Sequence, residues 1–406
     1  MRLHNPLWTE WTLALRFLFD NRLQTLLISL GIAIGCAVIV FITALITGLQ
    51  ANVVQRTLGT QAHIRILPLD EVNHAPPGRP AEWTLQLDNP RAQRLRSINN
   101  WQEVRNVLDS FPQVSAVSPV ISGPAFARRG EALQSTALIG IDAQRYQRII
   151  PIQQDIIAGV FRIGAGDAVI GRQLAADLGM AVGDKLRLDG GQGREAVVNV
   201  AGIFELGVRE LDARYVYLDM KQAQALLDLP GAATAIDLTV TDIFAAQVIA
   251  ERIGRLTGLK AESWMETNTQ LMNALRSQSL STQMISLFVA LSVALGIASV
   301  LSVSVVQRTR EIGILRAMGT RQSQMLRVFL IQGALFGLAG SLLGGTAGYG
   351  LVGAFNTFGP KLFYIPLNPW LLASAAALAT VTGILSAALP ARRAAALDPV
   401  EAIRHV

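Results

Sequence analysis

Four stretches of this chain, each about thirty residues long, contain no Asp, Glu, Lys or Arg. They cover residues 23–55, 277–307, 328–360 and 362–391. A helix needs about 20 apolar residues to cross the hydrocarbon core of a bilayer, so each stretch is long enough to span it. One stretch comes first, a long mixed region follows, and three stretches come at the end. The pattern predicts a membrane protein with a large domain between its first and second crossings.

Basic residues gather at the same side of all four predicted crossings. They lie before the first span (Arg2, Arg16, Arg22), between the second and third (Arg308, Arg310, Arg316, Arg321, Arg327) and after the fourth (Arg392, Arg393, Arg404). Because basic flanks mark the cytoplasmic side, we expect both termini inside and residues 56–276 outside. The expected location is the cell inner membrane, with a periplasmic domain.

Composition excludes several other classes of protein. Half of the 406 residues are hydrophobic and only 16% are charged, below the quarter that is typical of a soluble globule. The net charge is +6, but the basic residues gather beside the predicted spans, so this charge does not indicate nucleic-acid binding. Cys36 is the only cysteine, so no disulfide can form within the chain, and four scattered histidines offer no metal-ligand spacing. We expect no metal site.

Short strand and helix patterns alternate through the outer region, which predicts compact α/β modules. Strands are expected at 63–67, 114–120, 133–141, 169–171, 184–188, 196–204, 214–218, 236–240 and 259–263, and helices at 101–110, 220–227 and 243–257. The segment 70–90 is rich in Pro, Asn and Gly and is expected to be irregular. We predict one split subdomain (56–147 with 232–264) that carries a strand-rich insert (148–231).

Two further patterns concern the helices. Residues 5–22 have an Asn-Pro start and tryptophans at helical spacing, which favours either an interfacial helix or a simple extension of the first span. The third span carries small residues four apart, a pattern that permits close helix contact within the chain or between subunits. These glycines are Gly333, Gly337, Gly340, Gly344 and Gly348.

The sequence motifs of common enzymes and coupled transporters are missing. No Gly-Lys dipeptide occurs, so there is no phosphate-binding loop, and G-x-S-x-G, H-E-x-x-H and C-x-x-C are absent. The spans hold no ionisable relay for protons. We therefore expect no catalytic residues and no directly bound cofactor, although a membrane-bound enzyme with an unrecognised outer site remains an alternative.

The connection between the second and third spans reads QRTREIGILRAMG, and the chain closes with PARRAAALDPVEAIR. Both resemble the matching segments of FtsX-like permeases, the membrane subunits of MacB-type transporters. The resemblance implies a coupling helix that sits on a separate cytoplasmic ATPase dimer, which would bind ATP and Mg²⁺. The residues carried over are Arg308, Arg310, Glu311, Ile312, Gly313, Ile314, Leu315, Arg316, Ala317, Met318 and Gly319. Independently of the resemblance, the apolar residues of this short segment have no hydrophobic core of their own to pack on. We therefore expect them to dock in a groove of a partner protein.

The same resemblance implies the names Porter and Sabre for the two outer modules, and a second permease copy, identical or a sister chain. A periplasmic adaptor and membrane lipids are further expected partners. The chain is similar above all to the LolC/LolE branch, at 48–59, 139–142 and 169–179. That branch has a long hook loop for a lipoprotein carrier, whereas this chain has only residues 189–194 there. The function that the resemblance implies is ATP-driven export or extraction of a lipophilic or amphipathic substrate, such as a lipid or lipoprotein, through motion passed to the periplasmic domain. An FtsX-like scaffold that activates cell-wall hydrolases without transport is the alternative function.

These interpretations together predict four transmembrane helices, arranged 1 + 3, and a large α/β extracytoplasmic domain. The predicted boundaries are 1–22 for the amphipathic helix, 23–55 for the first span, 56–264 for the periplasmic domain, 265–307 for the second span with its outer extension, 308–324 for the coupling helix, 325–356 and 369–391 for the last two spans, and 392–406 for the cytoplasmic tail.

Overall fold

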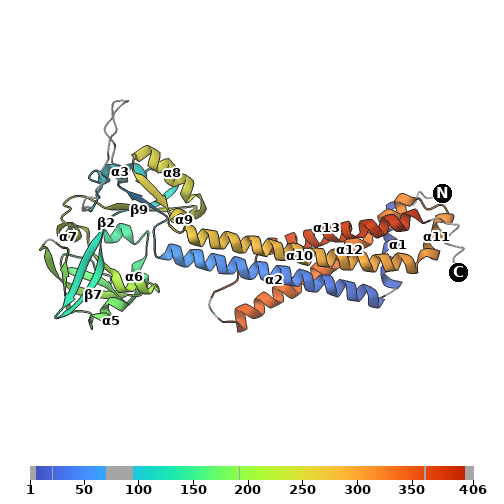
Figure 1. Cartoon of the computed structure of the whole chain (residues 1–406), viewed down its shortest axis with the longest axis horizontal. Helices are drawn as coiled ribbons and strands as arrows, with labels where there is room; N and C mark the ends of the chain where they lie inside the picture. The colour runs from blue at the N-terminus through green and yellow to red at the C-terminus, as the bar shows by residue number, and fades with distance from the viewer. Residues whose placement is uncertain (1–5, 21, 70–94, 192, 361–362, 398–406) are drawn as a thin grey trace, which may run out of the picture. The chain divides into compact units, whose positions relative to one another are not determined.

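The chain divides into two compact units, residues 1–54 with 273–406 and residues 55–272 (Figure 1). The computed structural model describes residues 6–20, 22–69, 95–191, 193–360 and 363–397. The predicted irregular segment 70–90 and the end of the closing motif, from residue 398 on, lie outside this part of the chain.

The first unit consists of helices. They are α1 (Pro6–Asp20), α2 (Arg22–Gly59), α10 (Thr269–Gln307), α11 (Thr309–Ala317), α12 (Gln322–Phe358) and α13 (Pro369–Ala396). Within the described residues, α2, α10, α12 and α13 are the helices long and apolar enough to cross a membrane. Asn368 caps the start of α13, because its side-chain oxygen accepts a hydrogen bond from the backbone N–H of Trp370 at 3.0 Å.

Two predicted boundaries in this unit need correction. The helix of the last predicted span, α13, continues through the buried Pro390 to Ala396, beyond the predicted boundary at residue 391. The segment 308–324 is not one helix either, since α11 ends at Ala317 and α12 begins at Gln322.

The second unit is built around one ten-stranded sheet. Its strands are β1 (Ile64–Leu67), β2 (Val114–Arg129), β3 (Ala132–Ile141), β4 (Ile156–Gly159), β5 (Asp167–Gly171), β6 (Lys185–Asp189), β7 (Glu195–Phe204), β8 (Tyr215–Asp219), β9 (Ala235–Val240) and β10 (Lys260–Ser263). The strand order is β10-β1-β9-β2-β3-β8-β5-β7-β4, with β6 paired to both β2 and β7.

Six of these strands close on themselves. The pairs β2–β3, β3–β8, β8–β5, β5–β7, β7–β6 and β6–β2 form a ring. Alternate side chains of the ring fill its interior, among them Leu138, Ile170, Leu188 and Val216, all fully buried. Closure pairs the backbone groups that an open sheet would leave at its edges.

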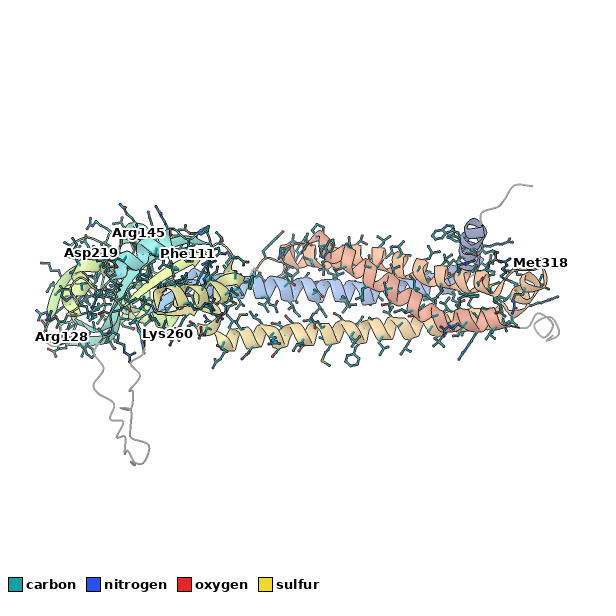
Figure 2. The ribbon with its side chains drawn as sticks, turned by 90° about the horizontal axis from the view of Figure 1, so that it is seen from above. Phe111, Arg128, Arg145, Asp219, Lys260 and Met318 are labelled. Carbon is teal, nitrogen blue, oxygen red and sulfur yellow. The ribbon has the colours of Figure 1, made fainter. Side chains whose placement is uncertain are left out.

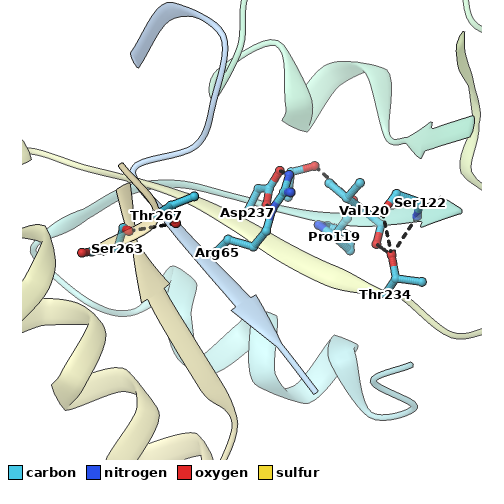
Figure 3. Close-up of polar contacts among 9 residues, drawn as sticks. Arg65, Pro119, Val120, Ser122, Thr234, Asp237, Ser263 and Thr267 are labelled. Atoms are coloured by element: carbon cyan, nitrogen blue, oxygen red, sulfur yellow. Dashed lines mark hydrogen bonds and ion pairs between the residues drawn. The ribbon is translucent and has the colours of Figure 1, made fainter. Parts of the chain in front are cut away.

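Three of the other strands extend the sheet beyond β2, and the fourth, β4, pairs with β7. β10, β1 and β9 continue the sheet from β2, and helices α3 (Trp101–Asp109) and α8 (Ala246–Thr257) contact β2, β1 and β10. Ile64 and Ile66 on β1 are fully buried. Figure 3 shows the polar contacts of this region, including Thr234, whose hydroxyl accepts a hydrogen bond from the N–H of Ser122 at 2.7 Å.

The two predicted outer modules share strands instead of meeting at residues 147 and 231. β2 pairs with β9 through residues 114–120 and with β6 through Phe126–Arg128, so one strand serves both. The sequence predicted a strand over 114–120 only, whereas β2 runs on to Arg129. The strand continues because Pro124 lies in the ladder opposite Ala137 and the hairpin turns only at Gly130, with φ +58°.

The smaller elements of this unit were partly missed. β4, α4 (Ala143–Tyr146) and α6 (Arg209–Arg214) carry no clear periodicity in the sequence. The remaining helices are α5 (Arg172–Asp177), α7 (Met220–Leu226) and α9 (Trp264–Thr267), with short 3₁₀ turns at Ile152–Asp155 and Ile243–Ala245.

Candidate functional site

The helix α11 is set off from its neighbours by a break at each end. Arg308 stands between α10 and α11 with φ −106° and ψ 16°, outside helical geometry. At the other end Gly319 has φ +99°, which favours glycine. The N–H of Gly319 donates to the carbonyl of Arg316 at 3.0 Å, and the N–H of Thr320 donates to that of Leu315 at 3.2 Å. This pair of bonds is a Schellman motif, and it ends the helix abruptly.

The inner face of α11 packs on α12 and α13. Ile312 is fully buried in a cluster with Met325 and Phe329 of α12 and Ala391 of α13, and Leu315 packs at its margin. The expectation that the apolar residues of this helix have no core to cover is therefore wrong for Ile312 and Leu315. Sequence could not show this, because α13 returns to this site from some eighty residues further along the chain.

Arg316 belongs to the inner face as well. Its Nη1 donates to the carbonyl of Ala395 at 3.0 Å and also contacts the carbonyl of Leu397. These carbonyls belong to the C-terminal end of α13, where a helix leaves acceptors unpaired and favours a positive charge. Arg316 thus joins α11 to α13.

The outer face of α11 is exposed. Arg310, Glu311, Ile314, Ala317 and Met318 face away from the bundle, and Met318 is 71% exposed. Figure 2 shows Met318 at the end of the helical bundle. We call these five residues the outer face of α11. It combines two charged side chains with two large apolar ones, a composition suited to contact with a protein.

The predicted glycines divide between two neighbours of α12. A Cβ at Gly333 or Gly337 would lie 2.4 Å from the carbonyl oxygen of Gly383 or 2.5 Å from that of Ala379, both on α13. The others face α2. A Cβ at Gly340 would lie 2.4 Å from Ile32, at Gly344 2.3 Å from the Ala33 carbonyl, and at Gly348 2.9 Å from Val40. One group of glycines therefore packs on α13 and the other packs on α2, so α12 lies between these two helices.

Sequence reasoning missed the contacts that join α1 to this region. Glu10 on α1 is 2% exposed and pairs with Arg327 on α12, while Asp20 at the end of α1 pairs with Arg308. A signal existed: Glu10 is the only charged residue in the first ten residues of α1, residues 6–15. A buried carboxylate requires a partner, and the nearby arginines were assigned only to membrane topology.

The outer unit contains a second cluster of chemically active side chains. Asp237 is fully buried, and its carboxylate accepts hydrogen bonds from Nε and Nη2 of Arg65 at 2.8 and 3.0 Å (Figure 3). Tyr146 and Tyr217 lie near it, and burial raises the pKa of both phenols above their ordinary value. Phenols with a raised pKa keep their protons near neutral pH and form little phenolate, so this cluster favours structure over catalysis. Among the described residues, no group of three or more His, Cys, Asp or Glu could hold a metal ion.

The chain is similar to two known protein families. The family of the MacB-like periplasmic core domain matches residues 25–256, and the FtsX-like permease C-terminal family matches residues 283–399. The first match alone covers more than half of the chain.

Its relatives include proteins named MacB and proteins named LolC. The macrolide export ATP-binding/permease protein MacB of Shewanella oneidensis is 28% identical over 96% of this chain, which spans only 60% of that protein's length. The lipoprotein-releasing system transmembrane protein LolC of Xylella fastidiosa is 25% identical over 93% of this chain and 92% of its own. The solved periplasmic region of MacB from Actinobacillus actinomycetemcomitans aligns at 14% identity with a TM-score of 0.36, over 54% of this chain and 95% of that one.

Proposed function

Because this chain belongs to the FtsX-like permeases that carry a MacB-like periplasmic core domain, we propose that it is the membrane subunit of an ATP-driven transporter. A separate cytoplasmic ATPase dimer, which binds ATP and Mg²⁺, would supply the energy. Both termini would lie in the cytoplasm, and the unit 55–272 in the periplasm. A second permease copy, identical or a sister chain, would complete the membrane part.

The observation that carries this proposal is the exposed outer face of α11. Its inner face is held by Ile312 and Arg316, so the exposed Ile314 and Met318 remain available to a partner. Glu311 lies 3.8 Å from Arg308, and its side chain is 61% exposed, so it can contact the same partner. A helix that is anchored on one side and exposed on the other can receive a push and pass it to the helices behind it. The ATPase would dock here.

The motion would then travel along α2 and α10. Each is an uninterrupted helix, of 38 and 39 residues. At 1.5 Å per residue each is about 57 Å long, nearly twice the hydrocarbon thickness. The side-chain Nε2 of Gln50 on α2 donates to the carbonyl of Leu275 and to Oγ of Ser279 on α10, both at 3.3 Å. These bonds join the two helices far from α11.

The cargo we propose is a lipophilic or amphipathic molecule, such as a lipid or lipoprotein, exported or extracted at the periplasmic side. Macrolides and lipoproteins, named for the relatives, are of this kind. The loop between β6 and β7 is short, with the N–H of Gly190 donating to the carbonyl of Arg194 at 3.0 Å. This supports a cargo route without a hook loop in this subunit. A periplasmic adaptor is a further proposed partner.

The test uses the permease in nanodiscs with the ATPase expressed beside it. Ile314→Asp and Met318→Asp should each weaken ATPase binding about tenfold or more, because they place a charge in the centre of the contact. Phe358→Asp is the matched control, since Phe358 is 92% exposed at the opposite end of α12. Equal binding by the two α11 variants and the control would overturn the docking role.

The same preparation separates transport from the FtsX-like scaffold. ATP turnover stimulated by added lipid or lipoprotein supports transport. Turnover that instead activates a cell-wall hydrolase, with no response to lipid, would assign the scaffold role.

A further inference from the structure

The breaks on both sides of α11 raise a mechanical problem. A push on α11 could be absorbed by rotation at Arg308 and at Gly319, because neither residue continues a helix. For motion to reach α10 and α12, something must hold α11 and its two neighbours together. Helix α1 contacts α11, α12 and Arg308, the residue that joins α10 to α11.

One end of α1 is fixed to α12. The carboxylate of Glu10 accepts hydrogen bonds from Nε of Arg327 at 2.9 and 3.1 Å and from Nη2 at 2.7 Å. This is a forked, charge-assisted pair, which fixes direction as well as distance. The side chain of Glu10 is only 3% exposed, whereas that of Arg327 is 47% exposed.

The other end of α1 is fixed to the junction of α10 and α11. Nη1 of Arg308 lies 3.1 Å from the carboxylate of Asp20, and Nη2 donates to the carbonyl of Phe17 at 3.1 Å. The guanidinium also lies 4.7 Å from the centre of the Phe17 ring. Its side chain is 11% exposed. The first break beside α11 is thus held at the C-terminal end of α1, where a positive charge is favoured.

Apolar contacts complete the connection between these two ends. Ala14 and Phe17 of α1 are buried against Val328 of α12, and Leu315 of α11 packs on the same cluster. The side-chain Nε2 of Gln332 on α12 donates to the carbonyl of Ala14 at 3.4 Å. On its other side α1 exposes Trp11 and Phe19, as a helix lying at the membrane surface would.

We propose that α1 is a brace that makes α10, α11 and α12 move as one body at their cytoplasmic ends, with Glu10 and Arg308 as positioning residues. Each of these ion pairs has one buried and one exposed partner, and such pairs contribute little net stability compared with apolar packing, so their value here lies in fixing one geometry. The proposal deepens the transport function above and rests on it for its purpose. The brace itself can be tested in the permease alone.

The first experiment measures amide hydrogen exchange of the permease in nanodiscs, without any ATPase. Glu10→Gln should make exchange in α1 and α11 about tenfold faster or more, because Arg327 loses its charged partner. The exchanged pair Glu10→Arg with Arg327→Glu should restore much of the protection. Arg16→Gln, an exposed change on the same helix, is the control and should leave exchange unchanged. Unchanged exchange in Glu10→Gln would overturn the brace.

The second experiment follows the transmitted motion. Spin labels at Ala51 on α2 and Leu280 on α10, in a Cys36→Ser background with one labelled copy per complex, report their separation before and after trapping the ATPase with ATP, Mg²⁺ and vanadate. The wild type should show a shift, Glu10→Gln should lose most of it while retaining ATPase binding, and the exchanged pair should regain it. A full shift in Glu10→Gln would refute the role of the brace. If the wild type bound no ATPase or showed no shift, the transport function would be refuted instead. The hydrogen-exchange experiment alone would then decide whether α1 is a brace.

Discussion

Arginine side chains near α11 have three different surroundings. Arg308 is held by α1, Arg316 binds the end of α13, and Arg310 faces outward. All three arginines have the same charge and lie in the connection between the second and third spans. The rule that basic residues flank spans on the cytoplasmic side therefore does not distinguish them. Their five donor N–H groups allow the inner two to satisfy several carbonyl or carboxylate oxygens at once. Only Arg310 remains in the outer face of α11.

Asp237 offers a test at the residue scale in the outer unit. Asp237→Asn should lower the free energy of unfolding by about 1–2 kcal/mol, less than the 3–5 kcal/mol typical of a fully buried pair, because Arg65 is 48% exposed and can turn to water. Urea unfolding followed by circular dichroism measures it. Glu195→Gln is the control, since its pair with Arg187 is about half exposed on both sides and should contribute less than about 0.5 kcal/mol. Equal losses in the two variants would show that burial does not decide the strength of these pairs.

At the scale of elements, α12 shows how two neighbours can share one helix. Gly333 and Gly337 contact α13, whereas Gly340, Gly344 and Gly348 contact α2. Without side chains at these positions the backbones approach closely, and dispersion contacts replace the hydrophobic effect that lipid cannot supply. The staggered spacing that the sequence shows therefore corresponds to two different contacts.

Paired alanine variants test this arrangement. Gly344→Ala should lower the melting temperature of the purified protein, because the new methyl group would lie 2.3 Å from the Ala33 carbonyl oxygen. Gly350→Ala, on the same helix but with no neighbouring atom within 4 Å of the added Cβ, should leave it equal or slightly higher. A fluorescence size-exclusion melting series compares them. If Gly344→Ala melted no lower than Gly350→Ala, the contact with α2 would not be tight.

The β strands illustrate what element-scale reasoning could not supply. Alternation located most strands, yet the ring closes only because β6, between Lys185 and Asp189, pairs with β2 some sixty residues earlier. No local pattern specifies a partner at that distance. The predicted modules therefore do not form separate sheets: β2 pairs with β9 of one module and with β6 of the other, so one sheet runs through both.

On the scale of the whole molecule, α10 is the least buried of the four apolar helices, and α12 the most. An apolar helix that its own chain leaves uncovered faces lipid or another chain. This agrees with a second permease copy in the proposed assembly.

The proposed topology has a direct test. In a Cys36→Ser background, Ser115→Cys on β2 should react with a membrane-impermeant maleimide in intact spheroplasts, and Arg321→Cys between α11 and α12 should react only after the membrane is opened. Both native side chains are exposed, so accessibility depends on the side of the membrane alone. Reaction of Arg321→Cys in intact spheroplasts would invert the orientation and exclude a cytoplasmic ATPase at α11.

The amino-acid sequence by itself determined the four apolar helices, the domain between the first two and the family, because hydrophobic length and a contiguous motif are local properties that survive without three-dimensional information. Tertiary structure decided which side of α11 is free, which neighbour each glycine meets, and that the outer strands close into a ring. Those outcomes depend on partners far apart in the chain: Glu10 with Arg327, Arg316 with Ala395, β2 with β6. Burial and charge pairing act between surfaces that folding brings together from distant parts of the chain. A sequence pattern can show that a residue needs a partner, but it does not show which residue that partner is.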